Sequence, residues 1–212
     1  MQIKATGGSW ISSKGYGLLN SSRSAKPEFD NGQPVSAPSE EFTSLPLKRY
    51  GRLDAYTKLG FAAVGLTLVD AKVQQNNEKQ AIGIIISTKC GCMDNDSAYY
   101  ETTLEKDGLF ASPNMFSYTL PGIVLGECAA HFKLTGPTFC VGEENALGSN
   151  ALTTAKLLLG AGAAKKIIVG ALNCSKSKAS ANGAAFVMLE ASETDEQTEI
   201  DCSDKNSIWD FF

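Results

Sequence analysis

Hydrophobic and polar positions along the chain define short apolar runs separated by longer, mixed segments. Residues 81–88 (AIGIIIST), 167–172 (IIVGAL) and 183–190 (GAAFVMLE) are almost continuously apolar. Runs of this length are typical of strands that are buried on both faces of a sheet. Residues 138–142 (TFCVG) predict a further strand, and residues 2–6 (QIKAT) predict a short strand that ends before a Gly-Gly pair.

The longer segments between these runs have helical spacing. Within residues 47–73, apolar residues recur near a helical period from Leu59 to Val69, with small residues between them. Gly60 and Gly65 lower the helix propensity. They also allow a neighbouring element to pack closely, so this helix is expected to be covered on more than one side. Further helices are predicted over 122–132 and 146–161, with a short one inside the polar segment 94–107.

Strands that alternate with helices indicate an α/β fold with a mixed, mainly parallel sheet between helix layers. The 212 residues suit a single domain, 1–212, with a sizeable core. Residues 20–46 are rich in Ser, Pro, Asn and Gly and predict a long surface loop. Residues 192–212 predict a polar, acidic tail with an aromatic end, which we expect to pack onto the domain or onto a partner.

Composition and charge narrow the classes of partner. The formal net charge is −4, and no basic run is interleaved with aromatic residues, so nucleic-acid binding is not expected. No apolar stretch approaches the length of a membrane span. The start of the chain has neither the apolar core nor the cleavage site of a signal peptide. A cytoplasmic location without a membrane span is therefore the expectation.

The cysteines do not form a recognisable disulfide or metal framework. Cys90 and Cys92 would share one face of an extended strand and are the only close pair. No second pair and no nearby histidine completes a set of metal ligands. Disulfide scaffolds are typical of short secreted chains. We therefore expect free thiols, no metal and no cofactor. The six cysteines are Cys90, Cys92, Cys128, Cys140, Cys174 and Cys202.

Four segments, in this order and at this spacing, resemble the β-ketoacyl synthases of the thiolase superfamily. The segments are KRYGRLDAYTKLGFAAVGLTLVDA, AIGIIISTKCG, GLFASPNMFSYTLPGIVLGECAAHFKLTGP and NALGSNALTTAKLLLGAGAAKKIIVGALN. They are similar to the family's first long helix, the strand after it, a Ser-Pro and Leu-Pro segment ending in Gly-Pro, and the nucleophile helix with its following strand. The resemblance spans nearly the whole chain but only the first half of such an enzyme. It implies a thiolase-like N-terminal half.

Asn145 falls at the position that the resemblance assigns to the nucleophile. In the family the nucleophilic cysteine lies nine residues after the glycine of Gly-Pro, and counting from Gly136 gives Asn145. A condensing enzyme needs a thiolate there, stabilised by the helix dipole and by free N–H groups. Asparagine supplies no comparable nucleophile, although it is a good helix N-cap. Glu143 and Glu144 suit a helix N-terminus and would oppose a second anion.

Other residues offer weaker candidates for catalysis. The resemblance requires two histidines, or a histidine and an asparagine, from the second half of the enzyme, but the chain has a single histidine, His131. We expect His131 at a helix surface or end rather than as a base. Cys128 lies three residues before it and can share its helix face, as an activated thiol requires. Cys140 is the remaining alternative, but it lies five residues before the nucleophile position and loses the helix register.

The resemblance leads to two functional hypotheses. The first is a non-catalytic, chain-length-factor-like subunit of fatty-acid, polyketide or aryl-polyene biosynthesis. It would pair with itself or with an active β-ketoacyl synthase, and an acyl carrier protein would be a further partner. The second is an acyltransferase of the same class with its nucleophile reassigned to Cys128 or Cys140. A purely structural subunit is a third possibility. In the first hypothesis, the family's dimer contact maps to Thr138, Phe139, Cys140, Val141 and Gly148.

Overall fold

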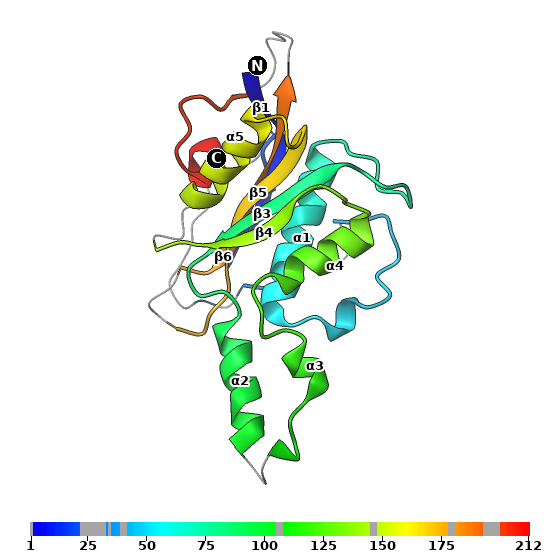
Figure 1. Ribbon diagram of the computed structural model, residues 1–212, viewed down its shortest axis with the longest axis vertical. Helices are drawn as coiled ribbons and strands as arrows, with labels where there is room; N and C mark the ends of the chain where they lie inside the picture. Colours follow the sequence, from blue (N-terminus) through cyan, green and yellow to red (C-terminus); the bar gives the residue numbers. More distant parts are fainter. Residues whose placement is uncertain are drawn as a thin grey trace.

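One sheet forms the centre of the molecule, with strand order β2-β1-β6-β5-β3-β4 and with β7 paired to β1 (Figure 1). The computed structural model describes residues 2–21, 33, 35–38, 42–104, 108–144, 148–177, 181–192 and 200–212. The strands are β1 (Gln2–Ser12), β2 (Gly15–Leu18), β3 (Ile82–Thr88), β4 (Thr138–Gly142), β5 (Lys166–Asn173), β6 (Gly183–Ser192) and β7 (Ile200–Asp201). The helices are α1 (Ala55–Asp70), α2 (Met93–Leu104), α3 (Pro113–Phe116), α4 (Ile123–Phe132) and α5 (Ser149–Gly160), with 3-10 turns η1 (Tyr50–Arg52) and η3 (Ile208–Phe211).

Helices cover both faces of the sheet (Figure 1). Because neighbouring side chains of a strand point to opposite faces, Ile84 and Ile86 of β3 pack with α1 and α4, whereas Ile85 packs with α5. The buried cluster that Ile85 forms with α5 also contains Ile208 and Phe211 of η3. The aromatic end of the chain therefore packs onto the domain, on the same face as α5.

The predicted α/β fold with a mixed sheet between helix layers is confirmed. Parallel pairing joins β3 to β4 and to β5, while β6 runs antiparallel to β5 and to β1. The parallel part is thus smaller than the sequence pattern suggests. The reason lies in the connection 174–182, which is too short for the helical crossover that a parallel pair requires.

The predicted strand at residues 2–6 continues to Ser12 through the Gly-Gly pair, with a register shift between Ala5 and Gly7. A Cβ at Gly7 would overlap the backbone of Ala71, just after α1. The glycine therefore allows the end of α1 to lie against β1 and does not end the strand. This is an effect of close packing that the local sequence does not reveal.

Helix α1 lies within the segment 47–73 for which the apolar pattern predicts a helix. Its N-cap is Asp54, whose Oδ1 accepts a hydrogen bond of 2.9 Å from Thr57 N. A side-chain cap of this kind satisfies one of the free N–H groups of the first turn. The residues of this segment before the N-cap form η1 and turns.

The described part of the segment 20–46 contains no helix, but it is not wholly a surface loop. Phe42 is completely buried, and its ring lies 5.9 Å from Phe61 in an edge-on contact. A Cβ at Gly65 would meet the carbonyl oxygen of Phe42. The small residue in α1 thus admits an aromatic anchor from the preceding segment.

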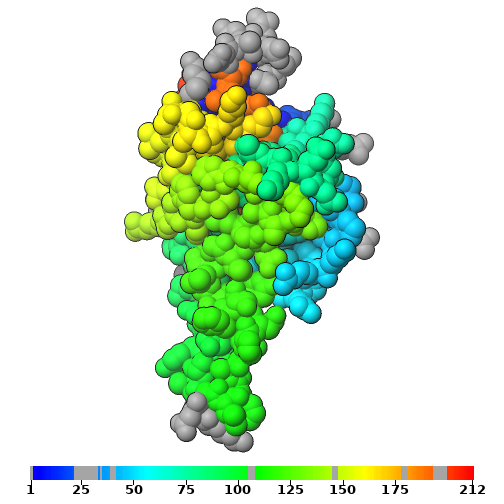
Figure 2. Space-filling model, turned by 45° about the vertical axis from the view of Figure 1, so that its right-hand side comes forward, coloured from blue at the N-terminus to red at the C-terminus, as the bar shows by residue number. Residues whose placement is uncertain are grey.

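Helices α2 and α3, with the described residues beside them (93–104 and 108–120), project from the body as an arm, drawn in green in Figure 2. The arm carries most of the large apolar side chains that remain exposed in the described residues. They are Met93, Tyr100, Leu104, Leu109, Phe110, Phe116 and Leu120. Exposed apolar side chains gathered in one region commonly mark a contact surface.

The described residues contain no helix with both the length and the apolar character needed to span a membrane.

Candidate functional site

The join between β4 and α5 is held by the carboxylate of Glu143. Its Oε2 accepts hydrogen bonds from Gly148 N and from Ser87 Oγ, both at 2.6 Å. Its Oε1 accepts from Ser149 N at 2.7 Å and from Asn150 N at 3.4 Å. Within the described residues, α5 begins at Ser149 rather than at the expected residue 146. Asn145 lies outside the described residues.

The capping carboxylate decides the electrostatics of this helix end. The first N–H groups of a helix lack partners within the helix and form its positive pole. Here three consecutive N–H groups, from Gly148 to Asn150, point to Glu143. A second anion at this end would meet a like charge, which disfavours its ionised form. The helix end is therefore arranged around a carboxylate.

Gly148 connects this site to the end of the chain. It is buried and has a φ of 79°, in the left-handed region that glycine adopts without a steric penalty. A Cβ here would overlap Ile208 of η3 and would lie 3.4 Å from Ala171 Cβ of β5. Gly148 thus packs inside its own chain, where a bulky replacement acts first on folding.

Strand β4 is an edge of the sheet and pairs only with β3 among the described strands. Ile84 N donates to Pro137 O, and Glu143 N donates to Thr88 O. In a parallel pair, alternate residues direct both backbone groups to the same neighbour. The backbone groups of Thr138, Cys140 and Gly142 therefore point away from β3, and of these Gly142 O accepts a hydrogen bond of 3.0 Å from Asn150 Nδ2.

The side chains of β4 face the core more than this edge. Phe139 and Val141 pack with the α5 cluster, and Cys140 packs with the α1 and α4 cluster. Replacing Cys140 by a bulky residue would therefore disturb the core. The outward surface of β4 is formed mainly by its backbone, together with the exposed Thr138 and Gly142.

Cys128 and His131 are placed on α4 but are not joined by a hydrogen bond among the described contacts. Cys128 is completely buried, and burial raises the pKa of its thiol far above the ordinary value, with Glu127 adding to the shift. His131 Nε2 lies 3.3 Å from Thr43 Oγ1 instead. Burial and the nearby Lys133 lower the pKa of His131. This arrangement does not activate the thiol, because a thiolate needs a base or a positive environment.

Four further thiols, two of them buried and two half-buried, are also held in their neutral form. Burial, with Cys92 nearby, raises the pKa of Cys140 to about 11. Burial is also the main cause for Cys92 and Cys174, whose pKa values rise to about 11, and for Cys202, whose pKa rises to about 12. Among the residues that the structure describes, no group of three His, Cys, Asp or Glu side chains could hold a metal ion.

These thiols predict a loss of stability at alkaline pH. Their contribution is fully present below about pH 9, the ordinary value of a thiol. It is lost as the pH rises towards about 11, because the unfolded chain ionises first. Urea unfolding across this interval should show a falling free energy of unfolding, and the Cys140→Ala variant should show a shallower fall. A free energy that stays constant across the interval would contradict the assignment.

The chain matches a known protein family over most of its length. Residues 16–205 match the family described as β-ketoacyl synthase, N-terminal domain. The chain belongs to the β-ketoacyl synthase family. The resemblance drawn from the four sequence segments is thereby confirmed.

Solved structures of ketosynthases share the fold. "The ishigamide ketosynthase/chain length factor" has a TM-score of 0.70 and 18% identity, covering 92% of this chain and 64% of that chain. The ketosynthase ApeO in complex with its chain length factor ApeC, from Xenorhabdus doucetiae, gives 0.64 and 16%, covering 91% and 80%. The AntDE:AntF complex, a type II acyl carrier protein with its ketosynthase, gives 0.62 and 14%, covering 89% and 62%.

At these identities the likeness to ketosynthases shows the fold. The chain spans less than two thirds of the length of the ishigamide structure. No curated protein matches the chain. The likeness to these structures therefore assigns no activity to this member of the β-ketoacyl synthase family.

Proposed function

We propose that this chain is a non-catalytic, chain-length-factor-like member of the β-ketoacyl synthase family. It acts by contact with a second copy or with an active β-ketoacyl synthase, in fatty-acid, polyketide or aryl-polyene biosynthesis. The observation that carries the proposal is the Glu143 carboxylate at the N-terminus of α5. It occupies the donors that would stabilise a thiolate, and the family's nucleophile position holds Asn145.

Two surfaces support the contact. The open edge of β4 presents backbone groups of Thr138 and Cys140 that have no partner among the described residues, and such an edge readily pairs with another strand. The arm formed by α2 and α3 adds exposed apolar side chains (Figure 2). Of the residues predicted for the contact, Gly148 is the one that lies inside the chain.

The solved structures supply the kind of partner. Two of them contain a ketosynthase with a chain length factor, and one contains an acyl carrier protein with its ketosynthase. We therefore propose an active β-ketoacyl synthase as the first partner to test and an acyl carrier protein as the second.

The alternative of an acyltransferase with a reassigned cysteine has less support. Cys128 is completely buried, and Cys140 is half-buried with a pKa of about 11. A thiol labelled rapidly at neutral pH by an acyl-thioester analogue would favour this alternative. Uniformly slow labelling would favour the non-catalytic proposal.

The contact predicts that an altered β4 edge weakens association. In the Thr138→Pro variant, proline removes one outward N–H group while the bonds between β3 and β4 remain, which an edge strand tolerates. We expect association to weaken roughly tenfold, the equivalent of about one hydrogen bond at the upper end of its usual range. Sedimentation velocity measures this, with the chain alone and mixed with active β-ketoacyl synthases encoded in the same genome neighbourhood.

The matched control is Thr138→Val, which keeps the N–H group and should associate like the native chain. Circular dichroism and thermal unfolding should show that both variants fold. A native chain that stays monomeric with itself and with every candidate synthase would overturn the proposed contact.

A further inference from the structure

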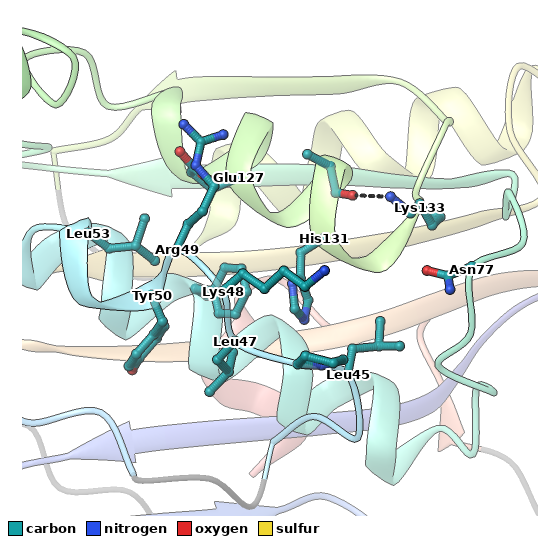
Figure 3. A pocket seen from close by; sticks show the side chains of 13 residues that line it. Leu45, Leu47, Lys48, Arg49, Tyr50, Leu53, Asn77, Glu127, His131 and Lys133 are labelled. Carbon is teal, nitrogen blue, oxygen red and sulfur yellow. Dashed lines mark hydrogen bonds between the residues drawn. The ribbon is translucent and has the colours of Figure 1, made fainter.

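A pocket of about 390 Å³ lies between the segment that precedes α1 and the C-terminal part of α4 (Figure 3). None of its lining residues belongs to β4 or α5. Leu45, Leu47, Leu53 and Phe61 supply apolar surface. The ring of His131 stands among them, with its centroid 4.9 Å from that of Phe61. The pocket thus has an apolar wall and a titratable group.

Cationic side chains gather around this pocket. Lys48 and Arg49 reach it from the segment before α1, and Lys133 reaches it from the end of α4 (Figure 3). Glu127 is the one carboxylate among the lining residues. Within the described part of the chain, no ion pair joins Glu127 to these cations. The local excess of positive charge contrasts with the net charge of −4 of the whole chain, and it attracts anions.

One side-chain hydrogen bond and partial burial set the surroundings of His131 in the free protein. Thr43 Oγ1 accepts a hydrogen bond of 3.0 Å from Leu45 N, so its own proton is available for His131 Nε2 at 3.3 Å. A hydroxyl has one proton and two lone pairs, so either Thr43 Oγ1 or His131 Nε2 can be the donor, according to the tautomer of the ring. Burial and Lys133 lower the pKa of His131, in keeping with the neutral form.

We propose that this pocket binds a small amphipathic anion. Its carboxylate or phosphate head would lie near Lys48, Arg49 and Lys133, and its aliphatic or aromatic body would lie against the apolar wall. The volume is at the lower end of the range for small-molecule sites, roughly 300–1,000 Å³. This excludes a long acyl chain in full. The inference does not depend on the proposed contact function, because it uses different residues.

The single histidine of the chain makes the test direct. His131 is the only histidine, so its imidazole signals in NMR report on this pocket without further assignment. The full chain is titrated with sodium octanoate and, separately, with octyl phosphate. We expect saturable shifts and a rise in the pKa of His131, because a bound anion favours the protonated ring. The other titratable groups lining the pocket are Lys48, Arg49, Tyr50, Glu127 and Lys133.

Two further probes distinguish the contribution of the anionic head group from that of the apolar body. Inorganic phosphate carries charge alone, and n-octanol carries the apolar body alone. Both should bind more weakly than the two amphipathic anions. The stronger of octanoate and octyl phosphate identifies the preferred head group. Octanol binding as tightly as octanoate would overturn the role of the cations.

Charge removal completes the test. The Lys48→Gln/Lys133→Gln variant should bind the preferred anion roughly fivefold more weakly, as expected for the loss of two partly exposed charges. Lys165→Gln, which removes an exposed lysine outside the pocket, should bind like the native chain. Lys133 also donates to Ala130 O, so the single Lys48→Gln variant serves if the double variant does not fold. Absence of saturable His131 shifts, or equal affinity in the native and Lys48→Gln chains, would overturn the proposal.

Discussion

The Gly148→Ala variant should lose a large part of the free energy of unfolding. A side chain at a φ of 79° costs about 1–2 kcal/mol, and its Cβ would overlap Ile208. Forcing an extra group into a packed core costs about 1–3 kcal/mol more. We expect a total loss of about 3 kcal/mol, a substantial part of the stability of an ordinary domain. Urea unfolding followed by circular dichroism measures it.

Gly160→Ala is the matched control for this experiment. Gly160 ends α5, and a Cβ there would meet no atom within 4 Å. Alanine at this position should leave stability unchanged or raise it by up to about 1 kcal/mol, because it favours the helix. Gly148→Ala with native stability but altered oligomeric mass would contradict the internal role of Gly148. It would return the residue to the contact surface.

The Glu143→Ala variant should be the next most destabilised. It removes the acceptor for Gly148 N, Ser149 N and Ser87 Oγ. Hydrogen bonds to a charged partner contribute about 1.5–3 kcal/mol each, although water replaces part of this at a half-buried site. We expect a loss of about 2–3 kcal/mol in the free energy of unfolding. Hydrogen exchange should show that the first turn of α5 opens more readily than the rest of the helix.

Glu144→Ala provides the comparison. Glu144 is the adjacent residue of the same type and is exposed, so its loss should change stability by less than about 0.5 kcal/mol. Glu143→Gln keeps one acceptor oxygen and loses the charge, so its stability should lie between the two alanine variants. Equal stabilities for Glu143→Ala and Glu144→Ala would show that the carboxylate does not support this helix end.

The two glutamates also show how far the sequence led at the candidate site. An acidic pair before a helix predicts stabilisation of its positive pole. The structure assigns this role to Glu143 and leaves Glu144 exposed. Ser87, which shares the carboxylate, lies 56 residues away in the chain, on β3. No local pattern could have paired them, because the contact depends on β3 and β4 lying side by side.

The sequence by itself determined the α/β fold, the family and the segments that became β3, β4, α4, β5 and β6, because buried strands and helices leave short-range apolar patterns. The residue count from Gly136 predicts that Asn145 occupies the family's nucleophile position, and this stays a prediction. Tertiary structure alone decided that β1 runs through its glycines against α1, that Gly148 fits beneath Ile208, and that the cations meet around His131. These features depend on contacts between residues that are far apart in the chain. Local sequence propensity does not depend on such contacts and so could not predict them.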